Sequence, residues 1–152
     1  MLDKTDKSLL VLLQENAKYT NKELAAKLNL TATPIFERVK RLEQDGYIKN
    51  YKAVIDRKKI GLSLITFCNV SLKNHETSMI AKFEKDIFQF TEVIECYHIA
   101  GMYDYLIKVM VKDMDEYQEF VAKKLASLEN LGQVQSSFVM TEVKTNSNLP
   151  VE

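Results

Sequence analysis

Cationic and hydroxyl side chains concentrate in one short segment near the amino terminus, where they could bind a polyanion. Arginine and lysine contact phosphates and guanine edges in duplex DNA, and hydroxyls contact phosphate oxygens. At helical spacing, Ile35, Val39 and Leu42 share one apolar stripe, and polar side chains occupy the opposite side. The residues expected to contact DNA are Thr31, Thr33, Pro34, Glu37, Arg38, Lys40 and Arg41.

Glu37 is the acidic member of this set, and a carboxylate close to phosphates costs free energy. Glu37 should therefore accept a hydrogen bond from a cytosine amino group or pair with Arg41, one helical turn later. The alternative for the whole segment is a solvated helix face that binds nothing. The elements around the segment favour the DNA-binding interpretation.

Two further helices are predicted ahead of this segment. Asp3 or Thr5 can cap the first helix, and Thr20 with Glu23 forms a capping box that opens the second. Thr31 can cap the third helix, which carries the cations. Two short helices joined by a tight turn, the second rich in Arg and Lys, are typical of a helix-turn-helix.

The basic residues that follow are expected to be extended and to form the wing of a winged helix-turn-helix. The predicted domains are a DNA-binding domain over residues 1–48, an extended linker or wing over 49–62, and a second domain over 63–152. Charge supports this division. Residues 1–60 carry 13 Lys and Arg against 8 Asp and Glu, and residues 61–152 carry 8 against 13.

The second domain alternates strand-like and helix-like segments. The predicted order is β-α-β-β-α-β, which is that of a ferredoxin-like sandwich and makes the chain an α+β protein. Some strands are apolar on both sides, so we expect another subunit to cover the free face of the sheet. The strands are expected over residues 64–72, 92–100, 103–111 and 134–143, and the helices around 79–87 and 114–128.

Composition excludes several classes of protein. The 152 residues include 46% hydrophobic residues and only four Gly and two Pro, which argues against disorder. No apolar run could span a bilayer and no signal peptide is evident, so we expect a cytoplasmic protein. Cys68 and Cys96 are too few for a disulfide framework and are expected to be buried. The two histidines lack ligand spacing, so we expect no metal site and no cofactor.

The whole chain resembles a known family. The segment LDKTDKSLLVLLQENAKYTNKELAAKLNLTATPIFERVKRLEQDGYIKNYKAVID resembles the DNA-binding half of the Lrp/AsnC (feast/famine) transcriptional regulators, and GMYDYLIKVMV and SFVMTEVK resemble their RAM domain, which is ACT-like. The resemblance implies sequence-specific DNA binding, a homodimer that assembles to an octamer, and an amino-acid effector bound between RAM domains. The positions that match the family in the turn and recognition helix are Leu30, Pro34, Arg38, Arg41, Leu42, Glu43, Gly46 and Ile48.

The resemblance also implies an effector pocket at the G-x-Y-D turn formed by Gly101, Tyr103 and Asp104. Asp104 could pair with an α-ammonium group, and backbone amides or Ser136 could bind an α-carboxylate. Alternatively, Asp104 only holds the turn through backbone contacts. His98 could face this pocket or the sheet face that joins the dimer, where its role would be structural.

The sequence therefore predicts a transcriptional regulator whose assembly and DNA binding respond to a small effector, in the cytoplasm and associated with the nucleoid. The alternative is an architectural DNA-binding protein with little sequence specificity. Ferredoxin-like folds also occur in enzymes and regulatory subunits. We find no nucleophile–base pair, phosphate-binding glycine loop or metal spacing in the sequence, so we do not expect an enzyme.

Overall fold

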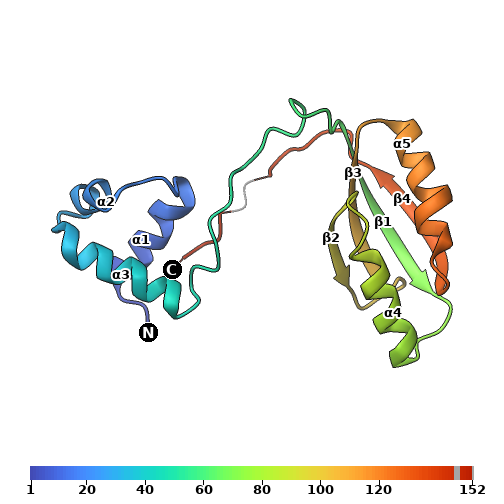
Figure 1. Cartoon of the computed structure of the whole chain (residues 1–152), viewed down its shortest axis with the longest axis horizontal. Helices are drawn as coiled ribbons and strands as arrows, with labels where there is room; N and C mark the ends of the chain where they lie inside the picture. Colours follow the sequence, from blue (N-terminus) through green and yellow to red (C-terminus); the bar gives the residue numbers. More distant parts are fainter. Residues whose placement is uncertain (146–147, 152) are drawn as a thin grey trace. The chain divides into compact units, whose positions relative to one another are not determined.

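The computed structural model describes residues 1–145 and 148–151 and divides the chain into two compact units (Figure 1). Unit 1 comprises residues 1–54 together with 144–152, and unit 2 comprises residues 55–143. The division at 54/55 falls within the segment 49–62 that was predicted to link the domains. The membership of the last residues in unit 1 was not predicted.

The described part of unit 1 contains three helices: α1 (Lys4–Glu15), α2 (Asn21–Leu28) and α3 (Ala32–Gln44). Asp3, and not Thr5, caps α1, and the capping box of Thr20 and Glu23 at the start of α2 is confirmed. A cap of this kind stabilises a helix by about 1 kcal/mol. Asn29 ends α2 in the left-handed conformation, at φ 53°, which makes the tight turn into α3.

One cap prediction is wrong. Thr31 occupies the N-cap position of α3 with extended backbone, but its side chain makes no capping hydrogen bond. Its hydroxyl is exposed instead, as are the side chains of Thr33 and Pro34 in the first turn. The start of α3 therefore presents polar groups outward.

The core of unit 1 brings the three helices together. From α3, Ile35 and Leu42 are fully buried, as predicted from their spacing. Burying each of these side chains contributes roughly 1.5–3 kcal/mol. The other buried members of this core are Leu9, Leu24 and Ala25. Packing of α1 and α2 on one side of α3 leaves the polar side of α3 uncovered within the unit.

The segment predicted to form the wing is not a strand in the described structure. Residues 49–56 have no regular secondary structure, although Tyr51 donates a hydrogen bond to Glu43 of α3 at 2.8 Å. The described elements of unit 1 are all helices, so an extended segment there finds no strand with which to pair.

Unit 2 has the predicted order of elements. It contains β1 (Leu64–Leu72), α4 (Thr77–Ile87), β2 (Val93–His98), β3 (Tyr105–Val111), α5 (Met114–Glu119) and β4 (Leu131–Phe138). The antiparallel sheet has the order β2-β3-β1-β4, so β2 and β4 are its edges. This is the ferredoxin-like arrangement, and the α+β fold class is confirmed.

The predictions for the last helix and strand need correction. α5 continues as a π-helical turn (Phe120–Lys124) and a short 3-10 turn (Leu125–Ser127), so the predicted single helix over 114–128 is irregular. β4 runs over Leu131–Phe138 and not over 134–143.

Strand alternation separates the two faces of the sheet. On one face, side chains such as Val70 and Ile107 pack with Phe83 of α4 and with Phe120, the first residue of the π-helical turn, in a single core. On the other face, Lys108 pairs with Glu95 at 2.9 Å and its ammonium lies 5.9 Å from the Phe67 ring. No helix of unit 2 packs on this second face, which remains only partly buried.

Two predictions from composition have different outcomes. Cys68 is fully buried as expected, but Cys96 is exposed because it lies on the edge strand β2. Among the described residues, no helix combines the length and apolar character needed to cross a membrane.

Candidate functional sites

The outward side of α3 brings together most of the residues predicted to bind DNA. An open hollow of about 560 Å³ runs along this helix. Its lining residues are Pro34, Glu37, Arg38, Lys40, Arg41 and Gln44. Gln44 was missed, although it follows Arg41 by three residues and so shares its side of the helix.

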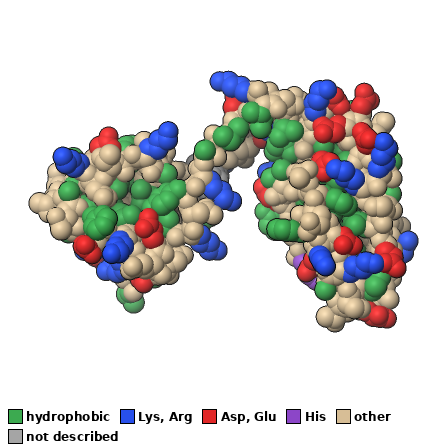
Figure 2. Space-filling view, viewed as in Figure 1, with side chains coloured by type: hydrophobic (Ala, Val, Ile, Leu, Met, Phe, Trp, Pro, Cys, Tyr) green, Lys and Arg blue, Asp and Glu red, His purple; other side chains and the backbone are tan. Residues whose placement is uncertain are grey.

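The cations of α3 are of two kinds. Lys40 is exposed and forms no ion pair among the described residues. Arg38 and Arg41 both turn toward the start of α1, where Asp6 accepts hydrogen bonds from them at 2.7 and 2.6 Å. Figure 2 shows basic and acidic side chains interspersed over the visible face of both units, without a continuous basic face.

Arg38 is the more constrained of the two arginines. It also pairs with Asp3 at 2.5 Å, and its side chain is only 29% exposed. Hydrogen bonds to Asp3 and Asp6 raise the pKa of Arg38 above its ordinary value. The alternative that Arg41 pairs with Glu37 is wrong, because Arg41 pairs with Asp6. These ion pairs were missed because they join positions more than thirty residues apart.

The predicted effector turn lies between β2 and β3, and a carboxylate holds it to β1. Gly101 has φ 152°, a conformation that favours glycine. One Asp104 oxygen accepts from the backbone N–H of Leu72 at 2.6 Å, and the other lies 2.8 Å from His75 Nε2. The hydrogen bond from Leu72, with a further one from His75, lowers the pKa of Asp104. Asp104 thus holds the turn to β1 in this structure.

Tyr103 and Ser136 lie in different surroundings. Tyr103 donates to the Gln135 side chain at 2.9 Å, so the turn reaches β4 through Gln135. The Ser136 hydroxyl lies 2.5 Å from Tyr117 Oη, on the side of the sheet that α5 covers. The prediction that Ser136 shares a site with the turn is not supported, since consecutive residues of a strand face opposite sides. Neither Gln135 nor His75 was predicted from the sequence as a neighbour of the turn. Strand alternation was the available signal for Gln135, because it places Gln135 on the face opposite to Ser136.

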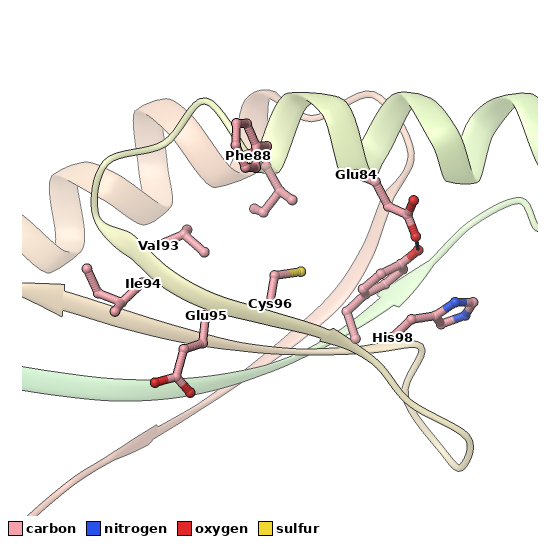
Figure 3. Close-up of a pocket in the computed structure, with 9 residues that line it drawn as sticks. Glu84, Phe88, Val93, Ile94, Glu95, Cys96 and His98 are labelled. Atoms are coloured by element: carbon pink, nitrogen blue, oxygen red, sulfur yellow. Dashed lines mark hydrogen bonds between the residues drawn. The ribbon is translucent and has the colours of Figure 1, made fainter. Parts of the chain in front are cut away.

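A second hollow, of about 440 Å³, lies between α4 and the edge strand β2 (Figure 3). His98 lines it and stacks on Tyr105, with the ring centroids 4.7 Å apart. Tyr105 donates to Glu84 of α4 at 2.7 Å, and burial followed by this contact raises the Tyr105 pKa. His98 therefore lies on the helix side of the sheet and not on the face that was expected to join two subunits.

Comparison with known families matches both units. Residues 2–49 match a winged helix-turn-helix DNA-binding family, and residues 65–149 match the Lrp/AsnC ligand-binding domain. The chain is 40% identical to the DNA-binding transcriptional activator DecR of Escherichia coli over the full length of both. It is 31% identical to the leucine-responsive regulatory protein of Escherichia coli, covering 99% of this chain and 92% of that protein.

Solved structures agree with these matches. A transcriptional regulator from Neisseria meningitidis, crystallised as a complex with L-Met, superposes with a TM-score of 0.95 at 34% identity, covering 99% of this chain and 97% of that chain. AsnC of Escherichia coli superposes with a TM-score of 0.85 at 26% identity, covering 95% and 96% of the two chains. The chain belongs to the Lrp/AsnC family of DNA-binding transcriptional regulators.

Proposed function

We propose that this regulator binds specific DNA sequences through α3 and that a free amino acid adjusts its assembly and its DNA binding. The observation that carries the proposal is the exposed polar side of α3, where Lys40 and Arg41 line the hollow and Thr31 and Thr33 are exposed at the start of the helix. A helix with such a face fits the major groove of duplex DNA.

A homodimer would present two copies of α3 to successive faces of the duplex. Its binding site would then be a pseudo-palindrome with half-sites about one helical turn, or a multiple of it, apart. The partly exposed second face of the sheet, around Phe67 and Lys108, is the surface that would join the two copies. Further association of dimers to an octamer would place turns from neighbouring dimers side by side.

The turn of Gly101, Tyr103 and Asp104 is the proposed effector site, and Ser136 is left out of it. An α-ammonium group would have to compete with His75 for Asp104. The effector acts only to the extent that it binds one assembly more tightly than another. The L-Met in the Neisseria meningitidis structure favours an amino acid as the ligand class.

A thermal-shift screen against the standard amino acids tests the effector proposal, since a ligand that binds only the folded protein raises its Tm. Calorimetry with the responding amino acid then compares the wild type with Asp104→Asn, which should bind it less tightly. If Asp104→Asn binds it as tightly as the wild type, the site lies elsewhere.

The alternative function is architectural DNA wrapping with little sequence preference. Footprinting on the promoter of its own gene separates the two. A specific regulator protects a bounded pseudo-palindromic site, whereas an architectural protein gives extended periodic protection without a consensus. We place the protein on the nucleoid in the cytoplasm in either case.

A further inference from the structure

The carboxylate of Asp6 is buried where α1 meets α3. Its side chain is 1% exposed, and both of its oxygens are occupied by arginines of α3. Oδ1 accepts from Arg38 Nη1 at 2.7 Å, and Oδ2 accepts from Arg41 Nη2 at 2.6 Å. Oδ2 also accepts from the backbone N–H of Asp3 at 3.1 Å. Burial of a carboxylate is tolerated here because it is fully hydrogen-bonded to two cations.

The two arginines are left in different states by this contact. Arg38 makes a second ion pair with Asp3, and its side chain is 29% exposed. The side chain of Arg41 is 51% exposed and forms one hydrogen bond, through Nη2. The other N–H groups of Arg41 have no partner among the described residues, and Arg41 lines the hollow along α3. Arg41 is therefore held through Nη2, and its other N–H groups are available to a ligand.

We propose that Asp6 is a positioning residue for DNA recognition: it fixes the guanidinium of Arg41 so that the remaining N–H groups meet a base edge in the major groove. Arg38, by contrast, holds α3 against α1 and is not a DNA contact. The inference rests on the DNA-binding function proposed above and adds to it a residue of α1 that does not touch the DNA. A guanidinium held in place loses less conformational freedom when it binds than a mobile one.

The same geometry could have the opposite effect. A negative charge beside two arginines could merely neutralise them, in which case its removal would strengthen DNA binding everywhere. The two possibilities differ in their dependence on DNA sequence. In a specific complex the register is fixed, so the orientation of Arg41 matters, whereas in a non-specific complex any orientation can reach some phosphate.

The test measures the affinity of Asp6→Asn for two duplexes by fluorescence anisotropy at fixed salt. One duplex is selected from a random pool by the wild-type protein, and the other is a scrambled duplex of the same composition. The matched control is Glu15→Gln, which removes one charge from the exposed end of α1, where Glu15 has no described partner. We expect Asp6→Asn to bind the selected duplex about tenfold more weakly and the scrambled duplex no less tightly. We expect Glu15→Gln to leave the ratio of the two affinities unchanged.

Two outcomes overturn the proposal: tighter binding of Asp6→Asn to both duplexes, or an equal loss on both with the fold intact. Should Asp6→Asn fail to fold, Arg41→Lys decides, because lysine keeps the charge but lacks the planar fork. We expect Arg41→Lys to lose about tenfold on the selected duplex only, and wild-type binding to both overturns the proposal. If the wild type itself shows no salt-sensitive affinity for either duplex, the proposed function fails. If it does while the variants match it, only this inference fails.

Discussion

Asp104 accepts a hydrogen bond from the backbone N–H of Leu72 at 2.6 Å, and this bond ties the turn before β3 to the end of β1. The other carboxylate oxygen of Asp104 lies 2.8 Å from Nε2 of His75. The side chain that is expected to bind a ligand therefore also stabilises the fold of the turn. An effector that displaces His75 from Asp104 would remove a contact that holds the loop between β1 and α4. Binding at the turn would then change the conformation of this loop.

Replacement of Asp104 should lower stability by an amount that depends on the acceptor lost. Asp104→Ala leaves the Leu72 N–H without its partner and should lower the free energy of unfolding by about 1–3 kcal/mol. Asp104→Asn keeps an acceptor oxygen and should cost less. Urea denaturation measures both, with Asp115→Ala as the control on an exposed carboxylate. Equal effects of Asp104→Ala and Asp115→Ala would show that the hydrogen bond between Leu72 and Asp104 does not stabilise the fold.

The same carboxylate should shape the response to acid. The Leu72 hydrogen bond and, to a lesser extent, His75 hold the pKa of Asp104 below its ordinary value. A group with a lowered pKa in the folded state stabilises the fold above its unfolded-state pKa, and this stability is lost as pH falls through the lower, folded value. Tm measured against decreasing pH should therefore fall less steeply in Asp104→Asn than in the wild type. Parallel curves for the two proteins would contradict this assignment.

Gly132 is required by close packing between two strands. A Cβ at this position would lie 2.7 Å from the backbone oxygen and 2.8 Å from Oγ of Ser71. Gly132→Ala should therefore force β4 away from β1 and cost about 1–3 kcal/mol. Urea denaturation tests this, with Gln133→Ala as the neighbouring exposed control. A Gly132→Ala variant as stable as the control would mean that the strands move apart freely.

The two thiols should differ in reactivity. Cys68 is fully buried and contacts Tyr117 at 3.2 Å, whereas Cys96 is exposed on β2. Native protein should therefore react with an Ellman-type reagent at one thiol and denatured protein at two. The residues that line the hollow around Cys96 partly desolvate its sulfur, although the residue stays accessible. This desolvation, followed by the charge of Glu84, raises the pKa of Cys96, so its reaction should accelerate with rising pH. Reaction of both thiols in native protein, or in neither, would contradict this difference.

Local patterns predicted most of the fold because local physics determines these elements. The capping box of Thr20 and Glu23 needs only four consecutive residues, and the burial alternation of β3 is written in its sequence. The segment after α3 forms no strand for a complementary reason: an extended segment becomes a strand only where another strand is available. No pattern within residues 49–56 carries that information.

The sequence predicted most residues of the candidate sites, but it did not predict the contacts that these residues make with distant segments. Helical spacing placed Lys40 and Arg41 on the outward side of α3, but it could not show that Asp6 holds Arg41. Likewise, Ser136 is one position away from Gln135, and a shift of one residue in a strand reverses the face. Contacts between distant segments decided both cases, and they depend on packing that one sequence does not display.

Fluorescence-anisotropy titration of a promoter duplex at increasing salt tests the central claim, that the outward side of α3 binds DNA. Wild-type affinity should fall linearly with salt on logarithmic axes, and Lys40→Ala should weaken binding and reduce the slope by about one. The control Lys73→Ala, an exposed lysine of unit 2, should leave the slope unchanged. An affinity independent of salt, or a slope that Lys40→Ala does not alter, would contradict the account.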